Sequence, residues 1–87
     1  MAILIRAEGK PSKVEPKKGK SFTLKELQTF VGGYIEILGL DDDFVFVVDE
    51  EGKLKEKPVN IGATWLTGGM LGPIVGDVLF CHRNEVK

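Results

Sequence analysis

The amino-acid sequence predicts one small α+β domain, in which a mostly antiparallel sheet packs on one main helix. The chain of 87 residues is long enough for one domain and too short for two. A capped amphipathic segment over 24–31 ends at two glycines, as a surface helix does. Apolar and β-branched runs at 2–7, 44–49 and 78–81 are typical of buried strands. The predicted order is β-β-α-β-β-(α)-β, with residues 1–87 as a single domain.

The first two strands are predicted from an apolar run and a turn signal. Ala2–Ala7 is apolar enough for a buried strand. Gly9 and Pro11 after it indicate a turn. A short return strand over Lys13–Pro16 would hide Val14 and end at its proline.

The main helix is the best-specified element. Thr23 and Glu26 have the spacing of a capping box, in which each side chain accepts a hydrogen bond from the backbone of the other residue. An apolar stripe runs along Leu24–Val31. Gly32 and Gly33 follow, where a left-handed residue can close the last turn without strain. The sequence therefore predicts a helix over 24–31.

A hairpin is predicted after the helix. Residues 34–38 alternate, so that Tyr34 and Glu36 leave the strand on the same face. The run Phe44–Asp49 has the β-branched and aromatic content of a central strand. Asp41–Asp43 form a polar turn between the two extended segments.

The last third of the chain predicts a short helix and a closing strand. Asn60 has the position of an N-cap for a helix over Ile61–Leu66, which Gly68 would end. The closing strand, from Val78 onward, alternates between two apolar faces and ends near Cys81.

Composition and charge argue against several classes of protein. The net charge of −1 does not favour non-specific binding to nucleic acid or to an anionic membrane. No apolar stretch approaches the roughly 20 residues of a membrane helix. The N-terminal apolar run has no basic leader and is interpreted as a strand, not a signal peptide. A single cysteine, Cys81, favours a reducing compartment, so we expect a cytoplasmic protein.

Three motifs follow one another along the chain. They are LKELQTFVGGYIEIL at 24–38, VVDEEGKLKEKPVN at 47–60 and IVGDVLF at 74–80. In this order they resemble a family of small bacterial and bacteriophage proteins described only as a domain of unknown function, with Asp49 standing where that family usually has asparagine. The resemblance covers almost the whole chain. It implies a shared fold and a frequent setting on phages, plasmids and other mobile elements, and it implies no agreed activity.

Tyr34 and Glu36 are the first candidates for a binding site. A ring that stacks on a planar ligand, next to a carboxylate that accepts from an amine or hydroxyl, would suit a nucleotide-like molecule. The alternative is a half-exposed sheet face on which the tyrosine packs its ring and keeps its hydroxyl in water.

Asn60, Trp65 and Met70 are the other candidate binding residues. The cap position already accounts for Asn60, and packing in the core is the alternative for Trp65. Met70 belongs to the glycine-rich stretch 67–76, which lacks the ending of a phosphate loop. This stretch is either an apolar loop over a ligand or partner subunit, or a simple connection that its glycines allow.

Two groups of charges have plain interpretations beside functional ones. The acids at 49–51 could hold a hard cation, but acids next to a turn glycine are usually solvated. Lysines at 10–25 could form an anion-binding face, but glutamates interrupt them and a solvated face is favoured.

Cys81 and His82 are neighbours on a strand, so they point to opposite faces and cannot act as a nucleophile–base pair. We predict no metal site and no cofactor.

These observations lead to three hypotheses. The first is a non-enzymatic interaction protein that binds a host protein or forms a homodimer. The second is a binder of a nucleotide-like ligand at a dimer interface, with Tyr34 and Glu36 in the site. The third is an enzyme with Glu36 as general base and Asn60 orienting a substrate. Because the chain offers no nucleophile–base set, the sequence favours a non-enzymatic role.

Overall fold

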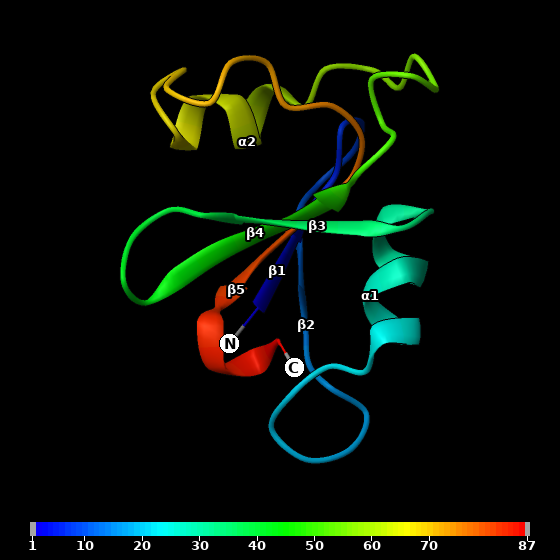
Figure 1. The fold of residues 1–87 in the computed structure, drawn as a ribbon, viewed down its shortest axis with the longest axis vertical. Helices are drawn as coiled ribbons and strands as arrows, with labels where there is room; N and C mark the ends of the chain where they lie inside the picture. Colours follow the sequence, from blue (N-terminus) through cyan, green and yellow to red (C-terminus); the bar gives the residue numbers. More distant parts are fainter. Residues whose placement is uncertain (1, 87) are drawn as a thin grey trace.

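A computed structural model describes residues 2–86 as five strands, two α-helices and one 3-10 turn (Figure 1). The order along the chain is the predicted one. The elements are β1 (Ala2–Ile5), β2 (Ser12–Val14), α1 (Leu24–Val31), β3 (Ile35–Gly39), β4 (Phe44–Asp49), α2 (Ile61–Leu66), β5 (Val78–His82) and η1 (Arg83–Glu85).

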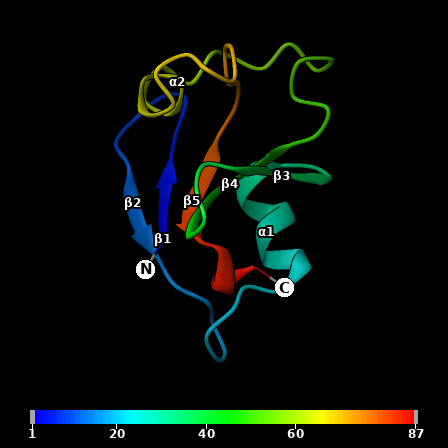
Figure 2. The ribbon, with the colours of Figure 1, turned by 60° about the vertical axis from the view of Figure 1, so that its left-hand side comes forward.

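The five strands form one sheet in the order β2-β1-β5-β4-β3, and all neighbouring strands are antiparallel. β5, the last strand in the sequence, therefore lies between β1 and β4. Figure 2 shows the strands side by side, with β2 at one edge and β3 at the other. The prediction of an α+β fold with a largely antiparallel sheet is confirmed.

The two helices cover opposite faces of the sheet, so the fold has three layers (Figure 1). α1 lies on the face where Leu27 and Val31 pack against Val45, Val47 and Leu79. α2 and the segment after it lie on the other face. That second core is formed by Phe46, Val48, Ala63, Ile74 and Val78. The alternation of β5 between the two cores is as predicted.

α1 begins and ends where the sequence indicates. The Thr23 hydroxyl accepts a hydrogen bond from the Glu26 amide at 3.1 Å, and the Glu26 carboxylate accepts from the Thr23 amide at 2.8 Å. Gly32 has φ of 81°, a left-handed conformation, and its amide donates to Gln28 O. The predicted capping box and glycine C-cap are both confirmed.

The structure excludes core packing for Trp65, whose side chain is 79% exposed. α2 has only six residues, and Ala63 is the one that it buries. A helix this short presents about one residue to the sheet on each turn, and a position opposite Ala63 faces water. Among residues 2–86, no helix is both long and apolar enough to cross a membrane.

Candidate functional site

α2 is fixed to the sheet by Asn60. Its Nδ2 donates to Ile5 O and to Gly76 O, each at 2.8 Å, and its Oδ1 accepts from the Ala63 amide at 3.0 Å. The side chain is fully buried. Asn60 thus caps α2 and joins it to β1 and to the start of β5. Its amide is engaged inside the protein and does not point to a ligand.

The segment after α2 returns across the helix and is held there by two hydrogen bonds. The Ile74 amide donates to the Thr64 hydroxyl at 3.0 Å. The backbone N–H of Asn60 donates to Ile74 O at 2.6 Å. Both bonds hold Ile74, which is buried, so the glycine-rich stretch is anchored near its C-terminal end and Met70 in its middle is left on the surface.

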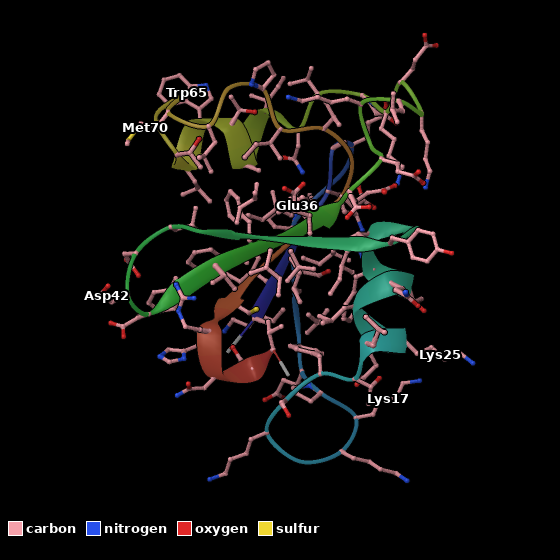
Figure 3. All side chains as sticks on the ribbon, in the orientation of Figure 1. Lys17, Lys25, Glu36, Asp42, Trp65 and Met70 are labelled. Atoms are coloured by element: carbon pink, nitrogen blue, oxygen red, sulfur yellow. The ribbon has the colours of Figure 1, made fainter. Side chains whose placement is uncertain are left out.

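An apolar surface results, which we call the α2 surface. Trp65 is 79% exposed and Met70 is 89% exposed. Figure 3 shows both side chains at the same end of the molecule, directed away from the sheet. The α2 surface consists of Ile61, Trp65, Leu66, Met70 and Leu71, all of them exposed.

The sequence carried a signal for this surface that its motifs did not reveal. Residues 58–76 contain no Asp, Glu, Lys, Arg or His, in a chain whose charged fraction is 29%. Ile61 and Trp65 are four residues apart and lie on one helix face, opposite the buried Ala63. An uncharged stretch with a single small core residue is the pattern of a helix that exposes apolar side chains.

Within residues 2–86, the hollow beside Glu36 does not extend to Tyr34. Tyr34 lies just before β3 and is exposed, and its carbonyl accepts from the Glu50 amide at 2.8 Å. Glu36 pairs with Val48 in the sheet and points toward the α2 layer (Figure 3). A hollow of about 170 Å³ beside Glu36 is lined also by Lys53 and does not reach Tyr34. Ligand pockets are usually about 300–1,000 Å³, so this hollow is too small for a nucleotide.

A larger groove of about 680 Å³ runs along α1 on the side of β2. Phe30 and Val14 line it, together with the lysines Lys17, Lys18 and Lys25 and the acids Glu15 and Glu26. Figure 3 shows Lys17 and Lys25 beside α1, at the end of the molecule opposite Trp65 and Met70. Because both signs of charge line the groove, it lacks the uninterrupted basic surface of a nucleic-acid site.

Asp49 is a charged residue whose burial the sequence interpretation missed. It was expected in a solvated turn, but its side chain is only 1% exposed. Lys57 and Lys55 contact its Oδ2 at 2.6 and 2.9 Å. Burial raises the pKa of this carboxyl, but the hydrogen bonds from Lys57 and Lys55 outweigh it and lower the pKa to about 2.

The same two lysines close the C-terminal end of α1. Lys57 Nζ donates to Val31 O at 2.7 Å, and Lys55 Nζ lies 3.3 Å from Gly32 O. Cations are favoured at this end of a helix because its carbonyl groups are unpaired there. A Cβ on Gly33 would lie 2.5 Å from Lys55 Nζ, so glycine is needed for this approach. The stretches 27–36 and 49–60 therefore meet at a structural ion-pair cluster.

Cys81 lies in the core on the α1 face. Burial raises the pKa of its thiol to about 12. A thiol in this environment is neither accessible nor ionised at neutral pH, and it does not act as a nucleophile. Within residues 2–86, no group of three His, Cys, Asp or Glu side chains is placed to hold a metal ion.

The comparisons with known proteins agree with the motif pattern. The family model of the domain of unknown function DUF3846 matches residues 1–87. No curated protein and no solved structure matches the chain. The stretches that meet at Asp49 are those in which the sequence resembled a small bacterial and bacteriophage family. With its full length matched, this chain belongs to the DUF3846 family.

Proposed function

We propose that this chain is a small non-enzymatic interaction protein that binds another protein through the α2 surface. The observation that carries the proposal is the exposure of Trp65, 79%, within a stretch of 19 residues without charge, 58–76. Tryptophan and methionine are enriched in the buried centres of protein interfaces, where charged residues are depleted.

The composition of the α2 surface favours a protein partner with an apolar groove. Trp65 alone exposes on the order of 200 Å². With its four apolar neighbours it approaches the size at which an exposed patch usually marks an interaction site. The anchoring of the segment by Asn60 and Thr64 supports the proposal, since a surface held in place loses little entropy on binding.

The buried Cys81 thiol also supports a role without catalysis, because the one cysteine of the chain is unsuited to nucleophilic chemistry. The resemblance to bacterial and bacteriophage proteins supports a setting in a phage or another mobile element. In that setting we propose that the partner is a protein of the bacterial host, bound in the cytoplasm.

Replacing Trp65 by alanine is expected to abolish capture of the partner. An interface tryptophan typically contributes 2 kcal/mol or more, so binding should weaken at least about 30-fold. The measurement is affinity capture from bacterial lysate with the tagged full chain, followed by titration of the recovered protein. The melting temperature should hardly change, because Trp65 packs little against the domain.

Tyr34→Ala is the matched control, since it also truncates an exposed aromatic residue but on a different part of the surface. The proposal requires that the same protein is recovered with wild type and with Tyr34→Ala. Loss of capture with Tyr34→Ala and its retention with Trp65→Ala would instead place the interaction beside β3.

A further inference from the structure

The two edges of the sheet differ in how they are protected. β2 has three residues, lies between Pro11 and Pro16 and carries Lys13. Proline, lysine and short length are the usual means by which proteins block an edge strand. β3, at the opposite edge, has five residues, IEILG, with neither proline nor lysine. The β3 edge is therefore open to pairing with another strand.

The hydrogen bonds of the hairpin show which backbone groups face this edge. The Glu50 amide donates to Tyr34 O at 2.8 Å, and the Leu40 amide donates to Phe44 O at 3.0 Å. In an antiparallel pair, the backbone N–H and C=O groups of one residue point to the neighbouring strand, and those of the next residue point away from it. The residues whose N–H and C=O groups point out to the free edge are therefore Ile35, Ile37 and Gly39.

An apolar side chain is exposed next to the open edge. Ile37 is 45% exposed and lies on the α1 face of the sheet, opposite Val47. An unpaired strand edge with an exposed apolar residue on it forms a surface suited to a second β-sheet.

We propose that β3 pairs antiparallel with β3 of a second copy of this chain, so that the two sheets become one. The two-fold axis passes through Ile37. Ile37 then faces Ile37 of the second copy, and Ile35 faces its Gly39. All three outward-facing residues of each strand form hydrogen bonds across the axis.

The charges fit this self-pairing. Glu36, the one charged residue of β3, faces Leu38 of the second copy. Moving the axis to Glu36 would set two carboxylates opposite each other, which is unfavourable. In the proposed register the exposed turn Asp41–Asp43 lies beside Gly33 of the second copy, where the amino group of Lys55 is. Lys55 also pairs with Asp49, and Arg83 binds the carbonyl groups of the turn, so the acids of the turn add to charge networks that both copies already hold. An unrelated strand would not bring this lysine to the turn, and the charges therefore favour a second copy.

The first test is the molar mass of the full chain by light scattering and sedimentation, up to about 1 mM. Wild type is expected to reach twice the 9.6 kDa of one chain. Ile37→Lys is expected to raise the dissociation constant at least about tenfold, because lysine blocks edge pairing. The control is Val59→Lys, at a residue of similar exposure, 48%, which should remain dimeric.

The second test fixes the register and does not depend on the folding of Ile37→Lys. Ile37→Cys should form a disulfide-linked dimer in a redox buffer, because directly opposed Cα atoms lie about 5.5 Å apart. Ile35→Cys should not, since its two copies would be about 14 Å apart. The buried Cys81 does not compete.

Three results would overturn the proposal: a wild-type chain that is monomeric throughout, a dimer that survives Ile37→Lys, or equal cross-linking of the two cysteine variants. The outcome is independent of the proposed function. Trp65→Ala should lose the partner and remain dimeric, whereas Ile37→Lys should become monomeric and still capture the partner.

Discussion

Asn60→Asp is expected to destabilise the domain by about 3–5 kcal/mol, which is a large part of the 5–15 kcal/mol typical of a small protein. The aspartate keeps the shape of the side chain and the acceptor for the Ala63 amide. However, it places a carboxylate oxygen against Ile5 O and Gly76 O, where the Asn60 amide now donates two hydrogen bonds. Hydrogen-bond acceptors would then face one another in a fully buried site. The introduced carboxylate must either stay charged without a partner or take up a proton, and both are costly.

Urea unfolding at pH 7 measures this cost, with Asn84→Asp as the control. Asn84 is exposed on η1, so the same chemical change there is expected to alter stability by less than about 0.5 kcal/mol. If Asn60→Asp remained within about 1 kcal/mol of wild type, the amide would not hold α2 to the sheet as described.

Local signals in the sequence predicted the fold well, and Asn60 shows where such signals end. Its cap position was visible because the cap and the first turn are neighbours in the chain. Its second role was not, because the Ile5 carbonyl lies 55 residues away in the sequence. The helix over 24–31 was predicted with its observed bounds because its capping box, apolar stripe and terminal glycines are all close together in the sequence.

The candidate site was harder to predict because exposure depends on what the rest of the chain covers. A lone tryptophan in a small domain is usually needed in the core. Here Phe46 and Ile74 fill the second core, and the small Ala63 lets α2 approach them. Trp65 is left on the outer side of the helix. The sequence identified Trp65 and Met70 as candidates, but it did not show that they share a surface. Nor did it show that the hollow beside Glu36 does not extend to Tyr34.

Asp49 illustrates the same difficulty for charges. Three acids next to a glycine indicate a solvated turn. The first of them is the last residue of β4, as the strand prediction over Phe44–Asp49 indicated, and it points into the sheet face that α1 covers. Lys55 and Lys57 reach it there from the following turn. No local pattern shows that these two lysines fold back over the end of the strand and bury its carboxylate.

Asp49→Asn is expected to destabilise the protein by about 1–2 kcal/mol at pH 7. The amide can still accept a hydrogen bond, but the charge that binds Lys57 and Lys55 is lost. This loss of stability is smaller than that of breaking a fully buried ion pair, because Lys55 is 40% exposed and water screens its interaction with Asp49. Asparagine has nearly the shape of aspartate, so the variant is expected to fold.

The dependence of this cost on pH gives the sharper test, because its sign follows from the pKa. The pKa of Asp49 is about 2 in the folded protein and 3.8 in the unfolded chain. Between these values the unfolded state binds more protons, so the stabilisation is complete above about pH 5 and is lost as the pH falls through 4 toward 2. The difference in unfolding free energy between wild type and Asp49→Asn should therefore shrink steadily over that range.

Asp42→Asn provides the control for net charge, since it removes an acid from the exposed turn between β3 and β4. Its difference from wild type should be small, because Asp42 is exposed and charges on the surface contribute little to stability. Parallel pH profiles for the two variants would mean that Asp49 contributes no more than an exposed acid. The lysines would then hold the end of α1 through Val31 O and Gly32 O alone. A profile that converges on wild type only for Asp49→Asn would instead show that the buried carboxylate joins the end of the helix to the sheet.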